Sequence, residues 1–66
     1  LTDEYAVEVE FAKKWAEAIG QSLHYAEVTG KKPAIVLIAD KNDSRHLDRL
    51  MKVANKYQIK VWVIEK

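Results

Sequence analysis

The sequence predicts an α/β domain of β-α-β-α-β order, with a three-stranded parallel or mostly parallel sheet and two helices. Residues 5–11 alternate between apolar and polar, which is the period of a strand, and the period then changes to the helical one. Two later runs, 34–39 and 59–64, are apolar on both strand faces, as in parallel sheets. Strands that alternate with helices pair in parallel through right-handed crossovers.

The first strand is predicted over residues 5–11. One of its faces carries Tyr5, Val7, Val9 and Phe11, and the other carries Ala6, Glu8 and Glu10. The first helix is predicted from Ala12 to about Val28, because apolar residues recur at steps of three and four. Its core stripe comprises Ala12, Trp15, Ala16, Ile19, Leu23 and Ala26. Gly30 suits the C-cap, where a left-handed conformation is common.

The second half of the chain supplies a strand, a helix and a strand. Pro33 ends the helical pattern, and 34–39 follows as a buried strand. Asp43 or Ser44 is a suitable N-cap for the second helix. That helix packs through Leu47, Leu50, Met51, Ala54 and Tyr57. Residues 59–64, rich in β-branched and aromatic side chains, predict the last strand.

Strand order bears on how this sheet is covered. If the order follows the chain, right-handed crossovers place both helices on one face and leave the other bare. A bare apolar face favours a homodimer or an additional N-terminal segment. The chain begins with Leu1. We therefore expect residues 1–66 to be a single domain that is incomplete at its N-terminus.

Length and composition exclude several classes of protein. A chain of 66 residues allows one small domain. It contains no cysteine, which excludes a disulfide framework, a thiolate zinc site and a cysteine nucleophile. No apolar run approaches the roughly 20 residues that cross a bilayer, and no secretory signal is recognisable. We expect no membrane association and a cytoplasmic location.

An acidic pair near the end of the first strand is the first candidate site. Glu8 and Glu10 leave the same strand face about 6 to 7 Å apart, close enough to bind one hard divalent cation. Ligands of open α/β sheets gather at the carboxyl edge, where Asp40 also ends a strand. Lys14 lies one helical turn beyond Glu10. Alternatively, these acids form a solvated strand face and ordinary helix N-terminal charges.

Both helices carry a second set of residues outside their core stripes. The first helix has an unusually apolar flank formed by Lys14, Ala18, Gln21, Tyr25 and Val28, which could also contact a neighbouring element or a dimer partner. The second has four cations at helical spacing, namely Arg45, Arg49, Lys52 and Lys56. Such a row could follow a phosphate backbone, although solvated helices also have it.

Three other features do not predict a site. His24 and His46 have no partner at metal-ligand spacing, so both are interpreted as surface or packing residues. The TGKK segment at 29–32 follows a helix and precedes a strand, whereas a phosphate-binding P-loop lies between a strand and a helix. Asp40 follows an apolar strand, as a phosphoacceptor aspartate does. The chain is too short to form a domain that carries such an aspartate, so this interpretation is rejected.

The segment EVEFAKKWAEAIGQSLHYAEVTGKKPAIVLI, residues 8–38, resembles the PD-(D/E)XK nuclease superfamily. The similarity is to the branch of RecB-type exonucleases and Holliday-junction resolvases. It rests on the acidic pair, on Gln21 and Tyr25 within QSLHYA, which resemble a Q-x-x-x-Y motif, and on the buried strand that follows. A restriction-endonuclease-like core fragment, the C-terminal half of that core, is the fold that this resemblance implies.

The resemblance implies a Mg²⁺-dependent DNA phosphodiesterase, with Mn²⁺ as a substitute metal. Glu8 is then the metal-binding acid with Glu10 beside it, Gln21 supports the site, and Tyr25 and the cations of the second helix contact DNA. Glu10 stands where the motif has lysine, so Lys14 takes that role. The superfamily's preceding Asp lies upstream of this chain, which is therefore expected to be inactive alone. An upstream helix and hairpin would cover the bare sheet face.

Two other functions are compatible with the sequence. One is a non-enzymatic α/β module that self-associates or binds a partner through the bare sheet face and the second flank of the first helix. It predicts a stable dimer and no metal binding. The other is a nucleic-acid-binding remnant that uses only the cations of the second helix, whose DNA binding would be indifferent to Glu8→Gln.

Overall fold

Three strands pair in parallel and in chain order in the computed structural model, which describes residues 3–66. They are β1 (Tyr5–Phe11), β2 (Lys32–Ala39) and β3 (Lys60–Glu65). Tyr5 pairs with Lys32 at the start of β1, and Ala34 pairs with Lys60 at the start of β3. The β-α-β-α-β order and the three-stranded parallel sheet expected from the sequence are confirmed.

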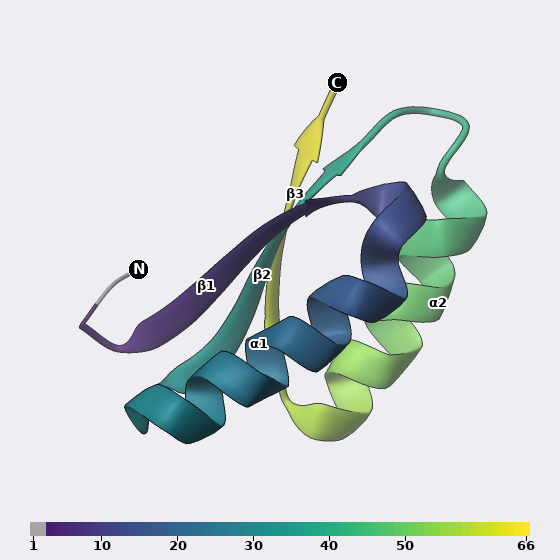
Figure 1. Cartoon of the computed structure of the whole chain (residues 1–66). Helices are drawn as coiled ribbons and strands as arrows, with labels where there is room; N and C mark the ends of the chain where they lie inside the picture. Colours follow the sequence, from purple (N-terminus) through teal and green to yellow (C-terminus); the bar gives the residue numbers. More distant parts are fainter. Residues whose placement is uncertain (1–2) are drawn as a thin grey trace.

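Two helices connect the strands, and both lie on the same side of the sheet (Figure 1). A 3₁₀ turn, η1 (Ala12–Lys14), leads into α1 (Trp15–Thr29), and α2 (Ser44–Tyr57) follows β2. Gly30 ends α1 in the left-handed conformation, at φ 71°, as its residue type predicts. Gln58 ends α2 at φ 57°. Neither helix has the length and apolar character of a membrane-spanning segment.

The boundaries of two strands differ from those expected. β2 begins at Lys32 rather than at residue 34, and β3 covers Lys60–Glu65 rather than 59–64. The Lys32 N–H donates to the Glu4 carbonyl at 3.0 Å, so the pairing with β1 begins before the apolar run does. The pattern of apolar residues in the sequence cannot reveal this extension of β2, because pairing with β1 determines where β2 begins.

The strands divide the molecule into a packed side and an open side. Ile35, Leu37 and Ala39 of β2 face the helices and form the core with Leu50 and Ala54. Because side chains alternate along a strand, the intervening residues face away. We call that surface the open face; it carries Tyr5, Val7, Val9, Phe11, Lys32, Ala34, Val36, Ile38, Lys60, Trp62 and Ile64.

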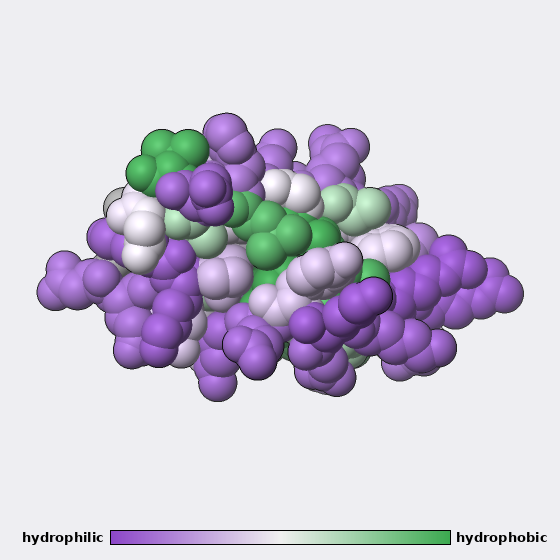
Figure 2. Space-filling model, turned by 90° about the horizontal axis from the view of Figure 1, so that it is seen from below, coloured by the Kyte–Doolittle hydropathy of each residue, from purple (hydrophilic) through white to green (hydrophobic). Residues whose placement is uncertain are grey.

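Large apolar side chains remain accessible on the open face. Val9 is 56% exposed, Phe11 is 52% exposed and Ile64 is 53% exposed. Figure 2 shows the molecule turned by 90° from Figure 1. Apolar side chains reach the surface near the centre of this view, and hydrophilic side chains surround them. Right-handed crossovers in chain order account for the open face, because they place both helices on the other side.

The buried stripe of α1 differs from the predicted one. Ala16 is exposed, whereas Ala18 and Ser22 are fully buried. The Ser22 hydroxyl donates to the Ile19 carbonyl at 3.1 Å, which satisfies it inside the core. A 3₁₀ turn advances about 120° per residue rather than 100°, so η1 rotates the helix that follows. Tyr57, expected in the core stripe of α2, is 52% exposed at the helix end.

Candidate metal and nucleic-acid site

Glu8 and Glu10 lie on the side of β1 that faces α1. They pair with Ile35 and Leu37, the core residues of β2, and both glutamates are half-buried. Glu10 Oε1 accepts a hydrogen bond from the Phe11 N–H at 2.9 Å. Both carboxylates therefore share one face of the sheet, as their spacing of two predicts.

Gln21 of α1 contacts Glu8 directly. When its amide nitrogen faces the carboxylate, Gln21 donates to Glu8 Oε1 at 2.9 Å and to Oε2 at 3.2 Å. This orientation is assigned because a carboxylate accepts hydrogen bonds and does not donate them. Two residues thirteen positions apart, both named by the resemblance, therefore meet at the α1–β1 junction.

Tyr25 lies one helical turn beyond Gln21. The residue is 45% exposed, and the centroid of its ring lies 5.9 Å from that of the His24 ring. It lines a shallow pocket at β1 with Ala6, Val7 and Thr29. The surface beside β1 thus includes Gln21 and Tyr25. Ala18, placed on the same flank by the sequence, lies in the core instead, for the reason given above.

Lys14 lies at the carboxyl edge of the sheet and is exposed. It lines a cleft together with Phe11, Ile38, Asp40, Asp43 and Lys66, among others. Within the part of the chain that the structure describes, no salt bridge joins Lys14 to Glu8 or Glu10. Lys14 therefore adjoins the end of β2 without being held at the acidic pair.

The acidic pair supplies the type of ligand that Mg²⁺ prefers. Among residues 3–66, no three His, Asp or Glu side chains gather closely enough to hold a metal. Mg²⁺, however, usually keeps several waters and is bound by one or two carboxylates plus substrate phosphates. Glu8 and Glu10 fit that pattern as the protein's share of the ligands, and the Gln21 amide nitrogen donates to Glu8 beside them.

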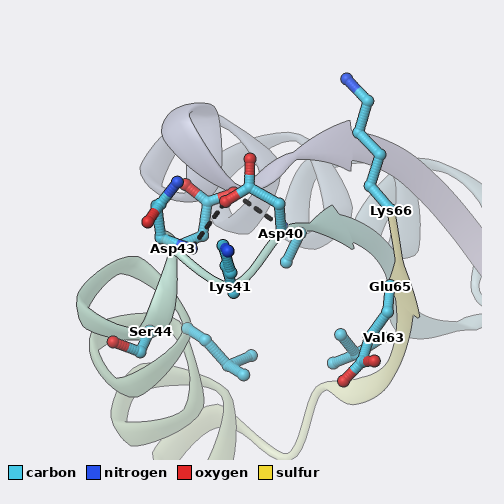
Figure 3. Close-up of a pocket in the computed structure, with 10 residues that line it drawn as sticks. Asp40, Lys41, Asp43, Ser44, Val63, Glu65 and Lys66 are labelled. Carbon is cyan, nitrogen blue, oxygen red and sulfur yellow. Dashed lines mark hydrogen bonds between the residues drawn. The ribbon is translucent and has the colours of Figure 1, made fainter.

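A second acidic group occupies the loop between β2 and α2 (Figure 3). The Asp40 N–H donates to Asp43 Oδ2 at 3.0 Å, and the Asn42 N–H donates to Asp40 Oδ1 at 2.7 Å. Both carboxylates therefore stabilise the turn, and Asp43 does not cap α2 through its side chain. Glu65, which the sequence analysis did not select, lines the cleft of about 470 Å³ beside this loop.

The four cations of α2 are all exposed, as a row on one side of a helix requires. Arg45 and Lys56 are eleven residues apart, which corresponds to about 16 Å along a helix. The buried residues of α2 are Leu50 and Ala54, so the row lies away from the core. His46 is half-buried with its Nδ1 lacking a partner, and His24 is exposed.

Comparison of the chain with family models, with curated proteins and with solved structures finds no match.

Proposed function

We propose that this chain is part of the core of a metal-dependent DNA nuclease that hydrolyses phosphodiester bonds. The observation that carries the proposal is the contact between Glu8 of β1 and Gln21 of α1. A strand acid and a helix glutamine need not meet in an arbitrary α/β domain. Their contact, with Tyr25 one turn further along α1, supports the use of these residues as one site.

Glu8 and Glu10 would hold Mg²⁺, or Mn²⁺ in its place. Such a metal polarises a phosphoryl oxygen and activates a water for attack. Glu8 is positioned by Gln21, whose two hydrogen bonds fix the orientation of the carboxylate. A further acid from outside residues 3–66 would complete the site, and we expect little cleavage from this chain alone.

The remaining residues would act on the substrate. Lys14, exposed at the carboxyl edge, is our candidate for neutralising charge on the scissile phosphate. Tyr25 offers an exposed ring and hydroxyl to the DNA strand beside β1. The cations of α2 would bind phosphates without reading sequence.

Calorimetric titration of Mn²⁺ into the 66-residue chain tests the metal site. We expect one Mn²⁺ per chain, and we expect Glu8→Gln to weaken binding at least tenfold because it removes an anionic ligand. Glu27→Gln is the matched control, since Glu27 is an exposed acid of α1 outside the site. Unchanged Mn²⁺ affinity in Glu8→Gln, or the same loss in Glu27→Gln, would sink the assignment.

The open face favours a second candidate function, a non-enzymatic module that self-associates or binds a protein partner. Apolar side chains that are more than half exposed, such as Val9 and Ile64, are characteristic of interaction surfaces when they are contiguous. Sedimentation on the calorimetric sample separates the two functions. A folded chain that dimerises and binds no Mn²⁺ would favour the module over the nuclease.

A further inference from the structure

The last strand of the sheet has a free edge. In the order β1-β2-β3, β3 has β2 on one side and no strand on the other. The Lys66 N–H donates to the Ala39 carbonyl of β2 at 2.8 Å. Because backbone groups alternate in direction along a strand, the N–H and C=O groups of Val61, Val63 and Glu65 point away from β2. Within residues 3–66, no hydrogen bond engages these groups.

The side chains of β3 are those of an interior strand. Trp62 and Ile64 lie on the open face, and Val61 and Val63 lie on the helix side. Runs that are apolar on both faces are typical of strands inside a parallel sheet. Every residue of β3 except Val61 is nevertheless exposed. Residues 61–64 include no proline and no charged side chain, which are features that keep edge strands from pairing.

The opposite edge of the sheet, along β1, is less suited to pairing. The Glu4 carbonyl accepts a hydrogen bond from β2, so the odd-numbered residues of β1 direct their N–H groups outward. One of these groups, the Phe11 N–H, already donates to Glu10 Oε1 at 2.9 Å. Tyr25 and Thr29 of α1 also lie beside this strand. The two edges therefore differ, and β3 is the one that is open to another strand.

We propose that two copies of this chain pair in antiparallel fashion through β3, about a two-fold axis that is perpendicular to the sheet and passes beside Val63. In this register Val63 faces Val63 of the second copy, and Val61 faces Glu65 of the second copy. The outward N–H and C=O groups of all three residues then have partners. The result is one six-stranded sheet with the four helices on one side.

Backbone and side chains both favour this register. An axis beside Trp62 would place Glu65 opposite Ile59, whose N–H already donates within its own chain at 2.8 Å. The axis beside Val63 avoids that conflict. It also places Trp62 opposite Ile64, and aromatic and β-branched residues that face each other stabilise a sheet. Pairing of β3 with β1 would instead be head-to-tail, which generates rings or open filaments rather than a closed dimer.

The proposed contact is weak. Lys60 faces Lys66 at each end of the paired strands, and like charges opposite each other are unfavourable in a sheet. Their ammonium groups lie over the rings of Trp62 and Phe11, at 5.7 and 5.4 Å, and thus toward their own chain. A single edge strand buries less than the roughly 800 Å² on each side that stable interfaces bury. We therefore expect a dimer that dissociates on dilution.

Charge substitutions at Val63 test the two-fold register. Val63 is 41% exposed and lines the cleft beside the β2–α2 loop, so a charged side chain can reach water there (Figure 3). Because residue 63 faces itself, Val63→Lys brings two ammonium groups together and Val63→Glu brings two carboxylates together. Sedimentation is expected to show each variant dimerising at least tenfold more weakly than the wild type. An equal mixture of the two variants is expected to dimerise again.

Val9→Arg is the matched control for the Val63 variants. Val9 is 56% exposed on the open face of β1, two strands from the free edge of β3. The substitution is expected to leave the dimerisation constant within twofold of the wild-type value. Circular dichroism checks the fold of every variant.

Amide hydrogen exchange shows whether the dimer forms by strand pairing. The N–H groups of Val61, Val63 and Glu65 are expected to exchange severalfold more slowly as the chain concentration rises, because pairing protects them. The N–H groups of Trp62 and Ile64 point to β2, so their exchange is expected not to slow with concentration.

Four results would overturn the proposal. They are a wild-type chain that stays monomeric at millimolar concentration, equal dimerisation of the wild type and Val63→Lys, a mixture of the two folded Val63 variants that stays monomeric, and exchange at Val63 that is independent of concentration. A dimer that Val9→Arg dissociates would place the contact on the open face and would likewise overturn it. None of these results depends on Mn²⁺, so the nuclease proposal is tested separately.

Discussion

At the residue scale, the two glycines of this chain differ in backbone conformation, although neither has an atom within 4 Å of where a Cβ would stand. Gly30 ends α1 at φ 71°, a conformation that costs a residue with a Cβ about 1 to 2 kcal/mol. Gly20 lies in the middle of α1, is exposed, and has nothing within 4 Å of where a Cβ would stand. Only one of them is required by the fold.

Alanine at the two positions is therefore expected to change stability in opposite directions. Gly30→Ala should lower the free energy of unfolding by about 1 kcal/mol, because the left-handed cap becomes strained. Gly20→Ala should raise it by roughly 0.5 to 1 kcal/mol through helix propensity. Urea denaturation measures both values, and each variant is the control for the other. A loss of stability in Gly20→Ala would contradict this account.

The contact between Glu8 and Gln21 shows how far the sequence predicts a site. Gln21, which the Q-x-x-x-Y resemblance names, contacts Glu8, and Tyr25 lines a pocket with Ala6 and Val7 of β1; the spacing of residues in the sequence does not predict either contact. Lys14 is not held at the acidic pair, because η1 carries the chain past the end of β1 before α1 begins. The turn made by Asp40 and Asp43 is also beyond prediction, since it depends on local backbone geometry.

At the element scale, the sequence predicts the boundaries of the helices well. It predicts less well which of their residues are buried. Local signals place the end of α1 at Gly30 and the start of α2 at Asp43–Ser44, although the Asp43 side chain makes no capping hydrogen bond. The burial of Ala18 and Ser22 in place of Ala16 was missed, because a 3₁₀ turn does not alter the spacing of apolar residues in the sequence. Strand ends were missed where pairing with a neighbour extends them.

The row of cations on α2 predicts how the salt dependence of DNA binding responds to mutation. Arg49→Gln should lower the magnitude of the slope of log affinity against log salt by about 0.9, because one phosphate contact is lost. Binding should weaken by a similar factor for duplexes of any sequence. Anisotropy of a labelled duplex measures the slope.

Lys41→Gln serves as the control for Arg49→Gln. Lys41 is also exposed but lies in the loop between β2 and α2, outside the row. Equal slopes for the wild type and Arg49→Gln would mean that α2 does not contact phosphates. If the slope falls equally in Lys41→Gln and Arg49→Gln, DNA is attracted by the net charge of the protein rather than by the row of cations on α2.

At the scale of the whole molecule, strand order determines the division into a packed and an open side. The alternation of strands and helices and the one-handed crossovers predict this division from the sequence. The chemistry of the open face follows only from the register, which places Glu8, Glu10 and Glu65 on one side and Lys32 and Lys60 on the other. The acidic pair and the open face are thus on opposite sides of one three-stranded sheet.

The open face also affects the thermodynamics of unfolding. Apolar surface that is already hydrated in the native state adds nothing to the heat-capacity change when the chain unfolds. A chain of this length would ordinarily show about 0.8 to 1.0 kcal/mol/K. Scanning calorimetry of the isolated chain is expected to give a smaller value and hence a flatter curve of stability against temperature. A value within the ordinary range would mean that the open face is covered in solution.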